Sequence, residues 1–163
     1  ILHDIGKLGL ELGELGEVNP EDDVFYRMHP MIGNSILQPI GFLRPVTSMV
    51  LSHHERWDGS GFPEGLSGKD IPFYARLVAL ADAYERLINP REPGAPGLKP
   101  EIALQKIVAQ SGQAFDPEVV EAFRRLMEKR PELASAPPPS TPLFSLPTTT
   151  DDEAGPAQPG EKE

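Results

Sequence analysis

Histidine and aspartate are the residues of this chain whose types and spacing could do chemistry. Two adjacent histidines, His53 and His54, close an apolar helical pattern and lead into a glycine-rich loop. Two more, His3 and His29, also fall on or at the end of predicted helices, and Asp4 follows His3 directly. Neutral imidazole is the commonest metal-binding side chain, so this pattern raises the question of a metal site.

An aspartate in an apolar helix adds to this pattern. Asp82 lies within the most apolar helical segment of the chain. A buried carboxylate is costly unless a cation or several hydrogen bonds compensate it. Helical proteins build di-metal sites by bringing such residues from several helices into a common core. A single histidine is more often a cap or a surface residue, but four histidines with one buried acid favour a shared metal site.

Composition narrows the class of protein. The 163 residues suffice for one domain with a core of useful size. The absence of cysteine excludes disulfides and thiolate metal sites. A net charge of −10 argues against binding to a nucleic acid polymer. No apolar run approaches the ~20 residues of a membrane span, and no signal peptide is visible, so we expect a cytoplasmic protein without a membrane segment.

The predicted elements are helices, and no segment alternates as a strand would. The helices are expected at about residues 1–7, 20–36, 45–53, 73–87, 100–111 and 117–129. The second should bend or restart at Pro30 and bury one face, and the fourth should bury a broad stripe. Those faces comprise Val24, Met28, Ile32 and Ile36, and Phe73, Leu77, Leu80, Ala83, Tyr84 and Leu87. The fold class is therefore all-α.

The chain divides at Pro131. Residues 1–130 carry the helical patterns and form the predicted domain, and the chain opens within a helical pattern, so we expect further helices upstream. Residues 131–163 hold eight prolines and −5 of the net charge, because six acids face one lysine. Such a composition cannot form a core, so we expect a disordered Pro-rich and acidic tail.

A family resemblance becomes specific at the first histidine. His3-Asp4-Ile5-Gly6-Lys7 resembles the HD signature of the metal-dependent phosphohydrolase superfamily, and later segments are similar to its HD-GYP branch. Those segments are His29-Pro30, His53-His54-Glu55, Asp58-Gly59-Ser60-Gly61-Phe62-Pro63, Ala75-Arg76-Leu77, Ala81-Asp82 and Phe115-Asp116-Pro117-Glu118-Val119-Val120. They recur in order over most of residues 1–130. The resemblance thus implies an HD-domain helical bundle.

This resemblance implies a phosphodiesterase of bacterial second-messenger signalling that hydrolyses cyclic di-GMP to linear pGpG or GMP. The implied cofactors are two or three Fe or Mn ions, a choice that mixed imidazole and carboxylate ligands also favour. The implied metal ligands are His3, Asp4, His29, His53, His54 and Asp82. Asp4 would bridge two metals and Lys7 would lie near the scissile phosphate, which makes these two the implied catalytic residues.

The resemblance also implies substrate contacts and partners. The implied substrate-binding residues are Gly61, Phe62, Pro63, Arg76 and Arg91. Phe62 stands where the branch has tyrosine, so stacking on guanine survives and a phenolic hydrogen bond does not. The implied partners are the cyclic dinucleotide, GGDEF-type diguanylate cyclase domains, and an upstream sensory or receiver domain.

Three departures from the family pattern matter; the two in ligand-contact segments favour an alternative, which the intact His/Asp set opposes. The family takes a further histidine from helices before the HD pair, so the present chain is expected to bind metal poorly and to turn over little. The segment 8–14 lacks the family's Lys-Pro-Gly element, and the segment 90–94 keeps only Arg91 of a basic element. The alternative is a degenerate signalling module that binds metal or nucleotide without hydrolysis. A different HD phosphohydrolase, such as a nucleotidase, fits the Gly-Phe-Pro loop less well.

Several residues have structural alternatives. Arg76 is more readily explained as the partner of a carboxylate that holds the loop than as a substrate contact. Trp57 fits packing better than stacking on a ligand. Glu55 could orient a histidine or be solvated, and Lys7 could be a cation at a helix C-terminus. His29 with Pro30 could mark no more than a helix kink.

Overall fold

The computed structural model is mostly helical over the residues it describes, which are 2–8, 24, 26–90 and 96–130. Its α-helices are α2 (His29–Leu37), α3 (Arg44–Ser52), α4 (Phe73–Ile88), α5 (Pro100–Ala109) and α6 (Pro117–Lys129). Short 3-10 helices are η1 (Leu2–Asp4), η2 (Tyr26–Met28), η3 (Gly41–Leu43) and η4 (Gly68–Asp70). Within these ranges no strand forms, so the all-α prediction is confirmed.

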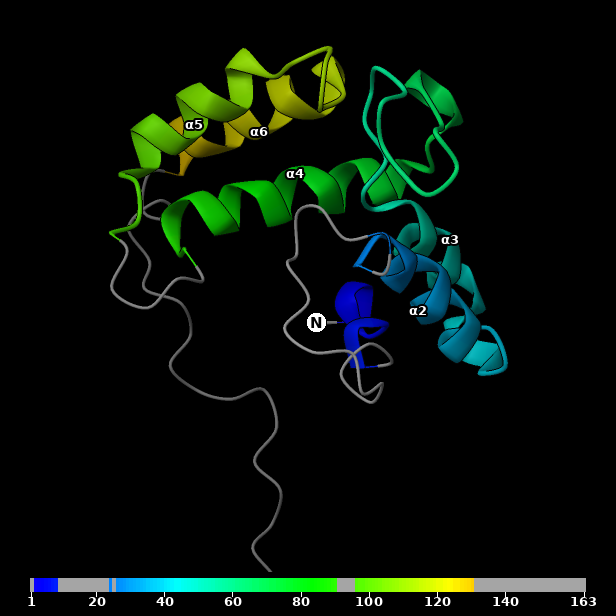
Figure 1. Ribbon diagram of the computed structural model, residues 1–163. Coiled ribbons are helices and arrows are strands. Elements are labelled where there is room, and N and C mark those ends of the chain that lie inside the picture. Colours follow the sequence, from blue (N-terminus) through cyan, green and yellow to red (C-terminus); the bar gives the residue numbers. More distant parts are fainter. Residues whose placement is uncertain (1, 9–23, 25, 91–95, 131–163) are drawn as a thin grey trace, which may run out of the picture.

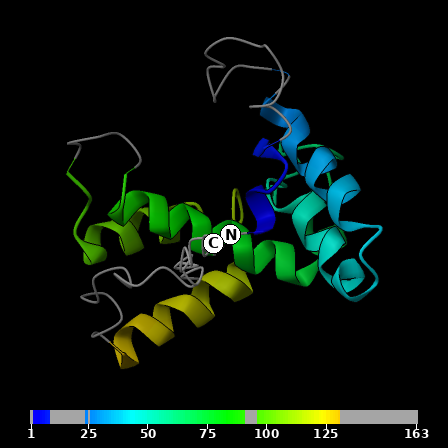
Figure 2. The same cartoon turned by 90° about the horizontal axis from the view of Figure 1, so that it is seen from below.

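Helix α4 lies at the centre of the arrangement. Helices α5 and α6 pack on one side of it, and α3 contacts it on the other side (Figure 1). Helix α2 packs against α3, and η1 contacts both of them. The view in Figure 2 shows the same separation, with α4 running between the two groups. The largest buried cluster joins α4, α5 and α6 through Leu80, Tyr84, Ala103, Ile107, Val119, Val120 and Met127.

The predicted stripe on α4 is right for its second half and wrong for its first. Leu80 and Tyr84 are buried in the cluster, and Leu87 packs against it. Phe73 and Leu77 instead have exposed fractions of 52% and 37%. The first turn of α4 buries the small side chain of Ala75, whose exposed fraction is 0%. The helix therefore turns a different face inward where it leaves α5 and meets the loop.

The predicted apolar face of the second helix is wrong. Val24 lies outside α2 and is 74% exposed, and Met28 and Ile36 are also exposed. The side of α2 that is buried carries His29, Pro30, Gly33 and Leu37. The helix begins at His29 with proline in its first turn, in line with the predicted restart at Pro30. The four-residue spacing of apolar residues identified a helix here, but it did not identify which side of the helix packs against the rest of the fold.

The beginning of the described chain also differs from expectation. A helix was predicted to end near Lys7, but η1 ends at Asp4, a turn follows at residues 5–6, and Lys7 and Leu8 are helical again. Lys7 is therefore not a cation at the end of a helix. The predictions for residues 9–23, for Arg91 and for the disordered tail 131–163 fall outside the described residues.

The remaining helix starts and stops follow their sequence signals. Asp116 caps α6, because its side chain accepts a hydrogen bond from the Glu118 N–H at 2.8 Å. Gly112, just after α5, has a φ of +76°, a conformation that glycine adopts without strain. None of the described helices combines the length and the hydrophobicity that a membrane crossing requires.

Candidate metal centre

Two glycines bring the first histidine-aspartate pair against α2. A Cβ added to Gly6 would collide with the carbonyl oxygen of His29 and lie 2.6 Å from the backbone nitrogen of Gly33. A Cβ on Gly33 would be 3.3 Å from the Gly6 nitrogen. Only glycines permit backbones to approach this closely. The turn after η1 is thereby fixed on α2, which sets Asp4 beside His29.

His29 and His53 are oriented by the backbone. The Nδ1 atom of His29 is 2.7 Å from the carbonyl oxygen of Tyr26, and that of His53 is 2.7 Å from the carbonyl oxygen of Val50. A carbonyl can only accept a hydrogen bond, so Nδ1 of each ring carries the proton. In the neutral rings both Nε2 atoms are then lone-pair donors. These two atoms lie 3.3 Å apart, and both residues are buried.

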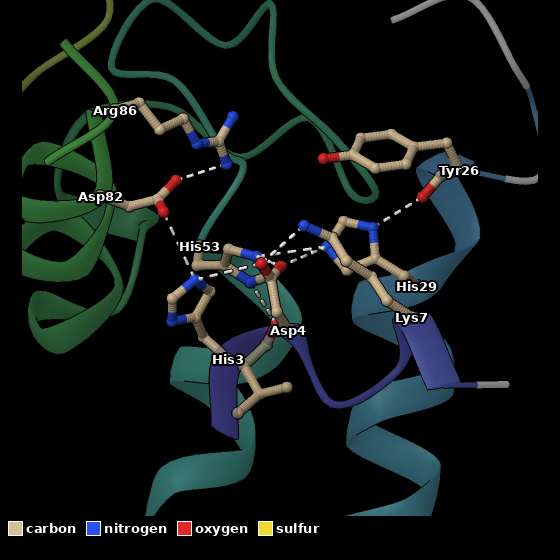
Figure 3. Close-up of polar contacts among 9 residues, drawn as sticks. His3, Asp4, Lys7, Tyr26, His29, His53, Asp82 and Arg86 are labelled. Atoms are coloured by element: carbon tan, nitrogen blue, oxygen red, sulfur yellow. Dashed lines mark hydrogen bonds and ion pairs between the residues drawn. The ribbon is translucent and has the colours of Figure 1, made fainter. Parts of the chain in front are cut away.

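Asp4 faces this pair of histidines (Figure 3). Its Oδ1 atom lies 3.4 Å from Nε2 of His29 and 3.8 Å from Nε2 of His53. Its Oδ2 atom lies 2.5 Å from Nζ of Lys7. Burial raises the pKa of Asp4, but the Lys7 ammonium, which donates a hydrogen bond to Oδ2, acts in the opposite direction, and the pKa of Asp4 lies below its ordinary value. The carboxylate is therefore ionised at neutral pH.

His3 and Asp82 extend the cluster on its α4 side. Nε2 of His3 lies 3.6 Å from Oδ2 of Asp4 and 3.5 Å from Oδ1 of Asp82. Arg86, one turn further along α4, forms an ion pair with Oδ2 of Asp82. Burial raises the pKa of Asp82, but His3 and Arg86 more than offset it and lower that pKa to about 2. Asp4 thus has His3 near one carboxylate oxygen and the His29–His53 pair near the other.

His54 has a buried nitrogen that makes no hydrogen bond. Its Nε2 atom is inaccessible to solvent and has no hydrogen-bonding partner among the described residues. Burial, with smaller contributions from the neighbouring His53, His29 and Arg86, lowers the pKa of His54 to about 2. A buried neutral imidazole with an unsatisfied nitrogen is costly without a ligand.

These atoms fit a metal ion. One ligand atom from each of Asp4, His29, His53 and His54 lies within 4.8 Å of the others. Two neutral Nε2 lone pairs and a carboxylate oxygen that face one another repel unless a cation lies between them. The backbone carbonyls that fix Nδ1 are the supporting contacts that metal-binding histidines ordinarily have. The His/Asp cluster is therefore compatible with a divalent metal site.

The loop after His54 is held by backbone contacts. A Cβ on Gly61 would lie 2.6 Å from both the His54 carbonyl oxygen and the Glu55 Cα, so glycine is required there for packing. Phe62 stacks on the His54 ring, with 4.8 Å between the ring centroids and 23° between the planes. Pro63 follows through a cis peptide bond. Gly61 and Phe62 thus support His54, and the predicted contact of Gly61, Phe62 and Pro63 with substrate stays a prediction.

Two residues of this region hold structure together. Glu55 is buried, so it is not solvated, and its Oε1 atom accepts hydrogen bonds from the backbone N–H groups of Glu64 and Gly65. Nη1 of Arg76 lies 2.5 Å from Oδ2 of Asp116, and Nε of Arg76 donates to the Ile71 carbonyl oxygen. These contacts favour the structural alternative for Arg76 over its predicted contact with substrate.

Sequence reasoning missed three residues beside the cluster. Tyr26 supplies the carbonyl that orients His29, and its ring lies 4.9 Å from the His29 ring and 5.3 Å from the Lys7 ammonium. Arg27 lies 4.9 Å above the Phe62 ring. Arg86 holds Asp82. Only Arg86 had a signal, because it follows Asp82 by four residues and so shares its face of the helix.

Comparison of the chain with known protein families identifies the family to which it belongs. The family model for the HD domain matches residues 1–119, so the chain belongs to the HD domain family. The predicted resemblance is thereby confirmed.

Curated relatives make the comparison more specific. A cyclic di-GMP phosphodiesterase of Thermotoga maritima is 41% identical over 133 residues, which are 77% of this chain and 35% of that protein. Another, from Vibrio cholerae, is 41% identical over 138 residues, 78% of this chain and 28% of that protein. A 3'3'-cGAMP-specific phosphodiesterase of Vibrio cholerae is 32% identical over 125 residues, 74% of this chain and 24% of that protein. The chain spans about a third or less of the length of these relatives.

A solved structure supports the fold. The crystal structure of a cyclic GMP-AMP specific phosphodiesterase of Vibrio cholerae superposes with a TM-score of 0.57 and 23% identity. The match covers 82% of this chain and 34% of that one. The described helices therefore have the arrangement of an HD domain.

Proposed function

We propose that this chain is the metal-dependent phosphodiesterase domain of a protein that hydrolyses cyclic di-GMP. The observation that carries the proposal is the pair of Nε2 atoms 3.3 Å apart on His29 and His53, facing the ionised Asp4. This arrangement is compatible with a bound cation, and the curated relatives that share the HD domain include cyclic di-GMP phosphodiesterases. The end product would be linear pGpG or GMP.

The proposed metal ligands are His3, Asp4, His29, His53, His54 and Asp82. Divalent ions held there supply positive charge to the phosphodiester oxygens and lower the pKa of an attacking water. Asp4, which has separate neighbours at its two oxygens, is the proposed bridge between two ions. The mixture of imidazole and carboxylate ligands favours Fe or Mn, with two or three ions.

Lys7 is the proposed cation beside the reacting phosphate. Its ammonium lies 2.5 Å from Oδ2 of Asp4 and 5.3 Å from the Tyr26 ring. Both contacts hold the charge at the rim of the cluster, where an incoming phosphate oxygen could accept a hydrogen bond from it. The lysine would stabilise the negative charge that develops on the phosphodiester, and it could protonate the leaving oxygen.

The experiment follows nucleotide in a metal-loaded protein. The full chain, and a longer version with its upstream helices, are reconstituted anaerobically with Fe(II) or Mn(II). Each is then incubated with cyclic di-GMP and, separately, with 3'3'-cGAMP, and the products are separated by chromatography. Conversion of cyclic di-GMP supports the proposal. Unchanged nucleotide in a folded, metal-loaded longer protein overturns it and favours the degenerate signalling module, which binds without hydrolysis.

One variant tests the ligand set. In the reconstituted protein, Asp4→Ala should lose both metal and turnover, because it removes the carboxylate shared by both sides of the cluster. Metal content is measured by elemental analysis after gel filtration. Full occupancy in this variant would show that the ligand set is wrong. We also propose the cytoplasm as the location and GGDEF-type domains or an upstream sensory domain as partners, since a second-messenger enzyme requires contact with its signalling system.

A further inference from the structure

A cavity opens from the candidate metal centre toward α5. It has a volume of about 570 Å³ and is bounded by His53, His54 and Asp82 on one side. The C-terminal half of α5 and the loop that precedes α6 bound it on the other side. Pockets for small molecules have volumes of about 300–1,000 Å³. The cavity is therefore large enough for part of a ligand whose reacting group lies at the cluster.

Three cationic side chains from separate elements line this cavity. Arg56 belongs to the loop after α3, Arg86 to α4, and Lys106 to α5. Arg56 is engaged by Asp58 and Ser60, and Arg86 by Asp82. Lys106 is exposed, and among the described residues no acid lies within ion-pair distance of it. Lys106 therefore keeps its charge available for a ligand.

The acids that line the cavity do not cancel this charge. Asp82 is paired with Arg86 on one oxygen and lies next to His3 with the other. Glu55 is directed to the backbone N–H groups of Glu64 and Gly65 by its Oε1 atom. Asp58 and Asp82 balance Arg56 and Arg86, so Lys106 is the lining cation with no acid within ion-pair distance among the described residues. Its charge can attract an anion into the cavity.

The walls between the charged groups are apolar. They are formed by Ala83 and Leu87 of α4, Ile107 of α5, and Phe115 before α6. Leu87 and Phe115 are partly buried against the main core, so their positions are fixed. Apolar walls with a few placed cations suit a molecule that has a flat heterocycle and a phosphate. An inorganic anion has no apolar part that could pack against these walls.

We propose that this cavity holds one nucleoside phosphate unit of the cyclic dinucleotide, with Lys106 as the contact to its phosphate. The inference rests on the proposed function, because that function places the other phosphodiester at the His/Asp cluster. A cyclic dinucleotide has two phosphates in one small ring, so a second cationic position close to the cluster is required. Lys106 determines affinity at this position and takes no part in bond cleavage.

The test compares two lysines with the same charge. GMP and guanosine are titrated calorimetrically into the Mn-loaded full chain and into Lys106→Gln, Lys106→Arg and Lys129→Gln. Lys129 is exposed in the last turn of α6 and lies outside the lining of the cavity, so its removal changes net charge equally. Hydrolysis of cyclic di-GMP is measured separately in the same preparations.

We expect Lys106→Gln to weaken GMP binding about fivefold, the effect of losing one solvent-accessible charge contact. Guanosine binding should not change, Lys106→Arg should restore GMP binding, and Lys129→Gln should leave it unchanged. Equal GMP affinity in Lys106→Gln and the parent would overturn the subsite even if cyclic di-GMP is hydrolysed. Binding of GMP that depends on Lys106, together with unchanged cyclic di-GMP in the folded, metal-loaded longer protein, would support the subsite and refute the proposed function.

Discussion

At the scale of single residues, the protonation of the histidines determines what the site can bind. Backbone carbonyls fix Nδ1 of His29 and His53 as the protonated nitrogen, so both Nε2 atoms face Asp4 with lone pairs. Burial lowers the pKa of His53 and of His54, which keeps both rings neutral at pH 7. Neutral imidazole is the form that binds metals. These neutral histidines therefore suit metal binding, but they destabilise the chain when no metal is bound.

The lowered pKa of His54 makes the stability of the metal-free chain depend on pH. The pKa of His54 is about 2 in the folded chain, and an unfolded histidine has a pKa near 6.5. Between these values the unfolded chain binds more protons, so the free energy of unfolding falls as pH decreases below about 6.5. The slope is at most about 1.4 kcal/mol per pH unit for each such histidine. Urea unfolding of chelator-treated protein at pH 7.5, 6.5 and 5.5 measures it.

A variant tests whether His54 causes this pH dependence of stability. His54→Gln should reduce the decrease in the urea midpoint between pH 7.5 and 5.5, since glutamine does not titrate. Asp4 and Asp82 contribute little in this window, because their lowered pKa values place their losses below about pH 4. Identical pH profiles for the parent and His54→Gln would contradict the assignment.

At the scale of elements, sequence patterns identified the helices better than their faces. Asp116-Pro117-Glu118 located the start of α6 because capping is local chemistry. The inward face of α2 was not predictable, because the contact of Gly6 with Gly33 determines it, and this contact joins residues distant in sequence. Histidines and Asp82 were singled out by type, while Tyr26 acts through a backbone carbonyl, which leaves no sequence signal.

The contact between the first turn and α2 can be tested with a matched pair of glycines. Gly6→Ala should destabilise the chain by about 1–3 kcal/mol, because its Cβ would meet the His29 carbonyl and force the backbones apart. It should also weaken metal binding, since Asp4 would move away from His29. Gly41→Ala is the control, as a Cβ there has nothing within 4 Å. Urea unfolding and metal titration measure both effects, and equal behaviour of the two variants would refute this role for Gly6.

The ion pair between α4 and the start of α6 is a second element-scale test. Arg76→Met leaves the buried carboxylate of Asp116 without its cation and should cost about 3 kcal/mol of unfolding free energy. Arg125→Met removes an exposed arginine paired with Glu121 and should cost less than about 1 kcal/mol. The affinity of Arg76→Met for cyclic di-GMP should remain that of the parent at temperatures where it is folded. A selective loss of nucleotide affinity without loss of stability would instead support the substrate contact.

At the scale of the whole molecule, the candidate metal centre joins the α2–α3 group of helices to α4. His29 and His53 come from the α2–α3 group, Asp4 from the first turn, and Asp82 from α4, whose other side packs on α5 and α6. The main buried cluster lies entirely within α4, α5 and α6. A ligand at the cluster therefore connects a part of the chain that the main core does not include.

Metal should accordingly stabilise the whole chain. Binding at 100 times the dissociation constant contributes about 2.7 kcal/mol, which corresponds to an increase in Tm of about 5–15 °C for a domain of this size. We expect Mn(II) to raise Tm by this amount in the parent and by much less in Asp82→Ala, because that variant removes the ligand contributed by α4. Asp70→Ala, which changes an exposed aspartate, should respond like the parent, and a chelator should reverse the shift. A full shift in Asp82→Ala, measured by calorimetry, would remove Asp82 from the ligand set and leave α4 outside the metal centre.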